Sequence, residues 1–152
     1  MTVLREQIET TLPIDEAFAF VGDFSNSANW DPGVVSSVKV GEQGVGIGTR
    51  YRLVVRMGGR TAPMEYVTTA WEPGRRVVLK GSGSGVDAVD EIRFESVPGG
   101  TRIDYTADIR LRGWMRPIAP FAGGALARIV RDGRDGMQRA LDTRAQQRTA
   151  GV

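Results

Sequence analysis

The central part of the sequence alternates between apolar and polar residues, and this pattern limits the possible folds more than any other feature. The period-two signal extends from Val34 to Leu111 and is interrupted at regular intervals by turn residues. It predicts six strands, at Val34–Val40, Thr49–Met57, Arg60–Trp71, Arg75–Ser82, Val86–Val97 and Thr101–Leu111. Because the connections between them are short, we expect these strands to form an antiparallel meander.

Three of the connections contain the residues that tight turns require. Met57-Gly58-Gly59-Arg60 suits a two-residue hairpin. Glu72-Pro73-Gly74-Arg75 and Val97-Pro98-Gly99-Gly100 each place proline second and glycine third, which is typical of a type II turn. These turns explain part of the glycine excess of 20 in 152 residues.

The segments on either side of the meander predict one further strand and three helices. Val3–Leu12 has the pattern of a strand, and Pro13-Ile14-Asp15 opens a short helix. A second short helix is predicted at Ser25–Trp30, ended by Asp31-Pro32. After Pro117 and Pro120, apolar residues at three-four spacing, from Phe121 to Leu141, predict one long C-terminal helix.

The length of the chain favours one domain, which we expect to span residues 1–148, with a frayed tail at 149–152. A seven-stranded twisted sheet curls around its apolar face, and one long helix can cover that face only in part. The remaining space is predicted to be an internal cavity, and concave apolar sites of this kind usually bind small molecules.

The composition excludes most catalytic and metal-binding templates, because the chain has no histidine and no cysteine. Thiolate and imidazole metal sites, disulfides and Ser-His or Cys-His nucleophiles are therefore impossible. We expect no metal and no cofactor.

The charge pattern limits the possible partners. The net charge is +2 and the arginines are spread through the chain, so no nucleic acid partner is expected. The longest uncharged run, residues 117–127, is far shorter than the ~20 residues of a membrane helix. Residues 113–118 could touch a membrane surface, but no basic stripe accompanies them. We expect a cytoplasmic protein without stable membrane insertion, either a monomer or a homodimer.

Four stretches of the sequence carry a family resemblance: Leu12–Phe18, Asp23–Val34, Trp71–Arg76 and Gly99–Arg102. In this order and spacing they resemble the helix-grip fold of the START, polyketide cyclase/dehydrase and birch-pollen-allergen superfamily, over roughly residues 3–145. The resemblance implies an α+β fold in which a seven-stranded curved antiparallel sheet, two short helices and a long C-terminal helix enclose a cavity. Members of the superfamily range from lipid carriers to cyclases of aromatic polyketides and hormone receptors.

The residues that we expect to contact a ligand are those that alternation or helical spacing turns toward the cavity. They are Tyr51, Leu53, Val55, Tyr66, Val67, Trp71, Leu79, Ile92, Phe94, Tyr105, Ala107, Gly133 and Met137. The family resemblance adds Trp30, which it places at the end of the second short helix to cap the mouth of the cavity; packing against the long helix is an equal alternative. For Gly133 two explanations are equally open: close packing of the helix on the sheet, or space for a ligand.

Two carboxylates, Glu65 and Asp90, are the candidate acid–base groups. Asp90 shares the inward face of its strand with Ile92 and Phe94. Burial in apolar surroundings raises the pKa of a carboxyl group, which suits proton transfer near neutral pH. The alternative is that one or both carboxylates lie in water at the rim or pair with an arginine.

The direction of Glu65 depends on the register of its strand. A register that buries Val67 and Trp71 also turns Glu65 inward, whereas the opposite register buries Met64 and Tyr66. Pro63 could cause a bulge that changes the register.

These observations lead to three functional hypotheses. The first is a protein that binds a hydrophobic small molecule, such as a lipid, a polyketide or an aromatic metabolite. The alternative is a cyclase or dehydratase that acts on a polyketide-like substrate through Glu65, Asp90 and tyrosine hydroxyls. A third is an interaction module that uses the outer Arg and Asp face of the long helix.

One departure from the family pattern bears on the enzyme hypothesis. Polyketide cyclases of the family are expected to bring an inward arginine and tyrosine hydroxyls to the folded chain. Here residues 61–71 contain no arginine and residues 34–40 contain no tyrosine, which argues against the same cyclase mechanism.

Overall fold

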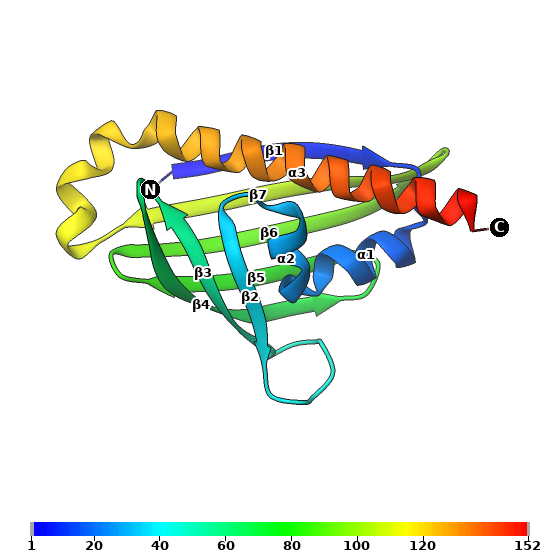
Figure 1. Cartoon of the computed structure of the whole chain (residues 1–152), viewed down its shortest axis with the longest axis horizontal. Helices are drawn as coiled ribbons and strands as arrows, with labels where there is room; N and C mark the ends of the chain where they lie inside the picture. The colour runs from blue at the N-terminus through cyan, green and yellow to red at the C-terminus, as the bar shows by residue number, and fades with distance from the viewer. Residues whose placement is uncertain (1, 152) are drawn as a thin grey trace.

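The computed structural model describes residues 2–151, and in it a seven-stranded antiparallel sheet curls around two short helices and one long one (Figure 1). In the sheet β1 lies beside β7, and β7 to β2 follow in reverse chain order. This is the predicted six-strand meander, closed at one edge by the N-terminal strand. The predicted helix-grip fold class is confirmed. The strands are β1 (Thr2–Thr10), β2 (Val34–Val40), β3 (Arg50–Met57), β4 (Arg60–Glu72), β5 (Arg76–Gly83), β6 (Val86–Val97) and β7 (Gly100–Leu111).

The helices come from both ends of the chain. They are α1 (Ile14–Gly22), the 3-10 helix η1 (Phe24–Asn26), α2 (Ser27–Trp30), the 3-10 helix η2 (Gly113–Phe121) and α3 (Gly123–Ala150). The second short helix is thus divided in two, because the Asp23 carboxylate accepts a 3.1 Å hydrogen bond from the amide of Ser25 and starts η1 earlier. Helix α3 continues to Ala150, two residues into the segment expected to fray, and Val152 lies outside the described residues.

The predicted turns have the backbone conformations that their glycines permit. Gly58 has φ 63°, and Met57 pairs with Arg60 across the two-residue hairpin. Gly74 and Gly99 have φ 70° and 87°, as the third residue of a type II turn requires. The register of the meander is therefore set locally by these connections.

Strand β4 takes the register that turns Glu65 away from the core. Met64 and Tyr66 are buried, so the expectation that Glu65 and Val67 face inward is wrong. The bulge lies between Thr68 and Ala70, not at Pro63. Since an extra residue switches the face of a strand, the bulge returns Trp71 to the inner side, where its ring meets that of Phe18 edge-on at 4.9 Å.

The C-terminal helix begins later than its apolar pattern predicts. Residues 113–121 form η2, which has two prolines and no buried residue, and Phe121 is 85% exposed. The buried residues of α3 are Gly133, Gly136, Met137 and Leu141. Figure 1 shows η2 and the first turns of α3 projecting past the end of the sheet, so no strand lies beneath this part of the apolar stripe.

The core is filled where α1 and the second half of α3 meet the inner face of the sheet. Phe18 packs edge-on against Phe94 at 5.0 Å, and Met137 and Leu141 are fully buried. Gly136 lets α3 approach the end of α2, because a Cβ there would lie 1.8 Å from the carbonyl oxygen of Trp30. Between the inner face of the sheet and α3, space therefore remains beneath the first half of the helix.

Candidate functional site

A cavity of about 100 Å³ lies between the inner face of the sheet and α3. Strands β6 and β7 form its floor, α3 covers it, and the end of α2 closes one side. Its lining residues are Glu6, Trp30, Asp31, Tyr66, Ala88, Asp90, Tyr105, Ala107, Ile109, Ile129, Val130, Gly133 and Arg134. The lining is thus largely apolar, with a few polar groups.

Asp90 is the buried acid of this cavity. It lies in the middle of β6, paired with Leu79 and Ala107 on the two neighbouring strands, and is 6% exposed. Burial raises the pKa of Asp90, the hydrogen bond from Tyr105 lowers it, and the charge of Asp31 raises it slightly, so that the pKa is about 7. That hydrogen bond joins the Tyr105 hydroxyl to Oδ2 of Asp90 at 2.7 Å. Asp90 can therefore hold or release a proton near neutral pH.

Asp31 is a second carboxylate of the cavity, and sequence reasoning used it only as the end of a helix. Its Oδ1 accepts a 2.8 Å hydrogen bond from the amide of Gly33. Burial raises the pKa of Asp31, the hydrogen bond from Gly33 opposes this, and the charge of Asp132 adds to it. A Cβ at Gly133 would lie 3.4 Å from Oδ2 of Asp31, so the bare backbone of α3 faces this carboxylate.

Three aromatic side chains complete the polar part of the cavity. The rings of Trp30 and Tyr105 meet edge-on at 6.2 Å, and the indole N–H of Trp30 is buried without a hydrogen-bond partner among the described residues. Burial, followed by the charge of Asp90, raises the pKa of both Tyr66 and Tyr105 well above its ordinary value. Both phenols therefore remain protonated at neutral pH and can donate a hydrogen bond.

The structure brings together six of the predicted site residues and separates the others from the cavity. Trp30, Tyr66, Asp90, Tyr105, Ala107 and Gly133 line it. Buried side chains that fill the core instead are Tyr51, Leu53, Leu79, Ile92, Phe94 and Met137. Val55 and Trp71 are partly buried against that core, and Glu65 and Val67 lie on the outer face. Alternation identified the inward face but not which part of it is already filled.

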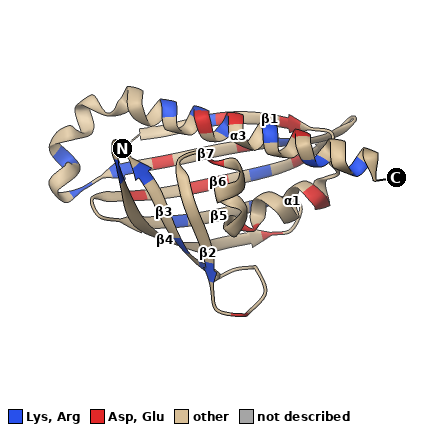
Figure 2. Cartoon of the chain, in the orientation of Figure 1, with Lys and Arg blue, Asp and Glu red and all other residues tan. Residues whose placement is uncertain are grey.

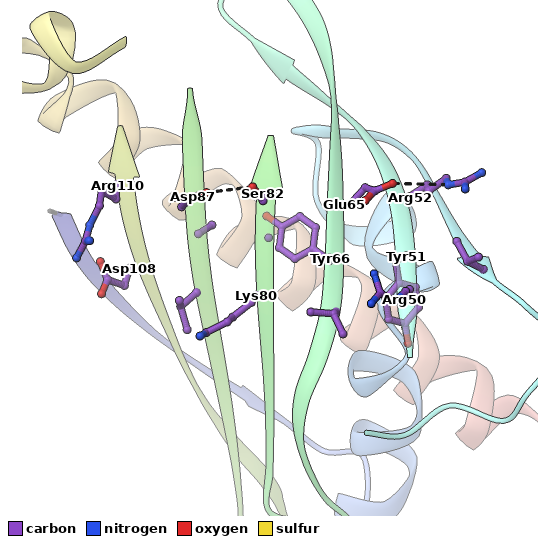
Figure 3. A pocket seen from close by; sticks show the side chains of 15 residues that line it. Arg50, Tyr51, Arg52, Glu65, Tyr66, Lys80, Ser82, Asp87, Asp108 and Arg110 are labelled. Carbon is purple, nitrogen blue, oxygen red and sulfur yellow. Dashed lines mark hydrogen bonds and ion pairs between the residues drawn. The ribbon is translucent and has the colours of Figure 1, made fainter. Parts of the chain in front are cut away.

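The outer face of the sheet carries a larger hollow, of about 570 Å³, which crosses β3 to β7 (Figure 3). Glu65 lies here, 3.9 Å from Nε of Arg52, and both side chains are more than 70% exposed. Asp87 accepts a hydrogen bond from Ser82 in the same hollow. Because Glu65 lies in water and pairs with an arginine, it lacks the desolvation that a buried acid requires.

Two further findings concern a metal site in this region and the lining residues that the sequence did not predict. Within residues 2–151, no three carboxylates are grouped closely enough to hold a metal ion. The lining residues that were not predicted as ligand contacts are Glu6, Asp31, Ala88, Ile109, Ile129, Val130 and Arg134. Gly133, a glycine in the apolar stripe of α3, indicated that another part of the chain packs closely against the helix, but not which side chain.

Comparisons with known proteins agree with this arrangement. A family model described as "Polyketide cyclase / dehydrase and lipid transport" matches residues 1–142, and the chain belongs to this family. An uncharacterized protein of Mycobacterium tuberculosis is 24% identical over 138 residues, which cover 86% of this chain and 81% of that protein.

Two solved structures share the fold at low sequence identity. The Zhui aromatase/cyclase from a Streptomyces species has a TM-score of 0.78 with 17% identity, over 97% of this chain and 95% of its own. A START superfamily protein from Mycobacterium smegmatis has a TM-score of 0.72 with 13% identity, over 95% and 97% of the two chains. These likenesses establish the helix-grip fold of the chain.

No helix within residues 2–151 combines the length and the apolar character that crossing a bilayer requires.

Proposed function

We propose that the protein binds a hydrophobic small molecule, such as a lipid, a polyketide or an aromatic metabolite, between the inner face of the sheet and α3. The observation that carries this proposal is the cavity, in which apolar residues line the space around the hydrogen-bonded pair of Asp90 and Tyr105, with Asp31 as a second buried carboxylate. Ligand sites typically combine an apolar lining with a few polar groups that orient the ligand. Membership of a family described by polyketide chemistry and lipid transport supports the same class of ligand.

The size of the cavity requires that α3 moves when such a ligand binds. Small-molecule sites usually enclose about 300–1,000 Å³, whereas this cavity encloses about 100 Å³. Ile129 and Val130 form the wall on the helix side, and the buried residues of α3 begin only at Gly133. η2 has no fully buried residue, so an outward movement of η2 and the first turns of α3 breaks few contacts, among them those of Met115 with the core and of Trp114 with Ser84.

Native mass spectrometry of gently purified protein, followed by titration with a library of lipids and aromatic metabolites, tests the proposal. Ala107→Leu enlarges a side chain on the cavity floor and should abolish uptake. Glu65→Gln, on the outer face, is the matched control and should leave uptake unchanged. Binding by Ala107→Leu that equals the binding of the unmodified chain would place the ligand outside the cavity and contradict the proposal.

The second candidate function is a cyclase or dehydratase, favoured by the pKa of about 7 that burial confers on Asp90. In this role Asp90 transfers a proton to or from the substrate, and Tyr105 holds its carboxylate in place. The residue pattern differs from that expected of polyketide cyclases, so in this role Asp90 alone transfers the proton and Tyr105 positions its carboxylate.

The enzyme candidate predicts a separation between turnover and binding. Asp90→Asn should remove turnover of a bound polyketide-like substrate and leave its binding nearly intact, because the amide keeps the size and the acceptor oxygen of the carboxylate. Glu65→Gln should turn over the substrate at the original rate. Equal turnover by Asp90→Asn and the unmodified chain would leave ligand binding as the function.

A further inference from the structure

One segment of the chain carries an excess of positive charge. Residues 109–131 cover the end of β7, η2 and the first turns of α3, and they contain five arginines and no acidic residue. The whole chain has 20 basic and 18 acidic residues, so the remainder is net negative. Figure 2 shows the turn that projects between β7 and α3 in blue and tan, without red.

The same segment exposes large apolar side chains. Trp114 is 66% exposed, Ile118 is 45% exposed and Phe121 is 85% exposed. Single exposed apolar residues are ordinary, but several on one projecting segment mark an interaction surface. We define the η2 surface as these three side chains together with three exposed arginines of the same segment, namely Arg116, Arg128 and Arg131.

The arginines of the η2 surface are free to bind an external anion. Arg112, by contrast, is held by the Asp87 carboxylate at 3.1 Å and by the carbonyl oxygen of Gly83 at 2.7 Å. Arg116, Arg128 and Arg131 are exposed, and none of them forms an ion pair within the part of the chain that the structure describes. Free cations beside exposed aromatic rings complement a surface with anionic groups outside and an apolar interior.

We propose that the η2 surface docks reversibly on a lipid bilayer that contains anionic lipids. Trp114 and Phe121 enter the interfacial region, where aromatic rings are favoured, and the three arginines lie among the anionic headgroups. The contact is peripheral, because η2 has only nine residues and lies at the end of the sheet. This docking is a property of the surface and does not depend on whether the cavity takes a ligand.

One residue connects the η2 surface to the cavity. Ile129 is 44% exposed and also belongs to the cavity lining. The cavity wall on α3 therefore begins within the η2 surface, between Arg128 and Arg131.

Vesicle flotation tests the proposal with two lipid compositions. The unmodified chain should float with equimolar phosphatidylglycerol–phosphatidylcholine vesicles, should remain unbound with pure phosphatidylcholine, and should lose binding as salt is added. Removing the charges with Arg116→Gln, Arg128→Gln and Arg131→Gln together should weaken binding about 100-fold, at about five-fold per arginine. The pair Trp114→Ser and Phe121→Ser should also weaken it, at unchanged charge.

Matched variants elsewhere distinguish docking from a general effect of charge or hydropathy. Arg50→Gln, Arg60→Gln and Arg139→Gln together remove as many exposed arginines, and Val38→Ser with Ile47→Ser removes exposed apolar side chains. Both control proteins should bind the anionic vesicles like the unmodified chain. Equal losses in the control and η2 variants, or no binding by the unmodified chain, would overturn the proposal.

Two further measurements distinguish membrane docking from self-association and from a loss of ligand binding. Self-association of the unmodified chain without vesicles, abolished by Trp114→Ser and Phe121→Ser, would assign the η2 surface to a second copy and overturn the proposal. Ligand uptake measured in solution should be unchanged in the arginine variant. Failure of vesicle binding with intact uptake would therefore reject the docking alone, and the reverse would reject only the proposed ligand binding.

Discussion

The hydroxyl of Tyr105 on β7 donates a 2.7 Å hydrogen bond to the buried carboxylate of Asp90 on β6. In the sheet, Tyr105 pairs with Ile92 and Asp90 pairs with Ala107, so the two side chains meet diagonally on the inner face. The pair lies in a cavity whose other lining residues are mostly apolar, with Asp31 as a second buried carboxylate. Its chemistry depends on the opposing effects of burial and of this single hydrogen bond on the pKa of Asp90.

The first prediction concerns the stability of the Asp90→Asn protein as a function of pH. In the unfolded chain the carboxyl group ionises near its ordinary pKa of 3.8, whereas in the folded protein burial raises the pKa to about 7. Between these values the folded state binds more protons, so the free energy of unfolding decreases as the pH rises. Asp90→Asn removes this loss and should stabilise the protein by about 4 kcal/mol at about pH 8.

Urea denaturation across the pH range measures this difference. The stability gain of Asp90→Asn should diminish as the pH falls and should vanish below pH 3.8, the ordinary pKa, because there the carboxyl group is largely neutral in both states. The variant Glu65→Gln, at an exposed position, is the control and should show no such pH dependence of its stability. A gain that grows as the pH falls would contradict the buried, proton-holding carboxyl group.

The second prediction is that Tyr105→Phe raises the pKa of Asp90 above about 7. The phenol stabilises the charged carboxylate by donating a hydrogen bond, and phenylalanine removes that donor at nearly the same volume. Titration of the carboxyl carbon of Asp90 by NMR measures the shift.

A partner variant should shift the same pKa in the opposite direction. The charge of Asp31 contributes to the raised pKa of Asp90, so Asp31→Asn should lower it. A pKa of Asp90 that stays constant in both proteins would show that burial alone determines it.

The third prediction separates two glycines of α3. A Cβ at Gly136 would lie 1.8 Å from the carbonyl oxygen of Trp30, so Gly136→Ala must displace the helix and should cost about 3 kcal/mol. A Cβ at Gly133 meets only the Asp31 carboxylate, at 3.4 Å. Gly133→Ala should therefore fold with near-normal stability but bind ligand more weakly, because its methyl group enters the cavity.

The control for this pair is Gly124→Ala, where no atom lies within 4 Å of the added Cβ. It should stabilise the protein by up to about 1 kcal/mol through helix propensity alone. Thermal unfolding and the ligand titration measure the three variants together. A Gly136→Ala protein as stable as Gly124→Ala would rule out the close approach of α3 and α2.

The fourth prediction is that Gly81→Ala displaces the ring of Tyr66. A Cβ at Gly81 would lie 2.4 Å from two ring carbons of Tyr66, which is buried against β5 and lines the cavity. Overpacking of this kind should cost about 1–3 kcal/mol. Gly44→Ala, with open space around the added methyl group, should cost nothing measurable. Urea denaturation of the two variants compares the costs, and equal values would contradict the contact between Gly81 and Tyr66.

The sheet could be predicted because its information is local. Alternation and turn residues lie next to one another in sequence, so β2 and β6 have the predicted bounds and the glycine turns have the expected backbone. The direction of Asp90 followed for the same reason, since no bulge interrupts β6 in its pairing with β5 or β7. The direction of Glu65 did not follow, because the bulge between Thr68 and Ala70 comes after it and Pro63 causes none.

By itself the sequence determined the order of elements, the antiparallel meander, and the exclusion of histidine and cysteine chemistry, because each depends on residue types and short-range spacing. Only the tertiary structure decided which inward side chains fill the core and which line the cavity. It also brought Asp31 and Gly133, which lie far apart in the sequence, to the same point. Such contacts depend on how α3 lies across the sheet, and that position results from long-range packing at Trp30 and Gly136 rather than from any local pattern.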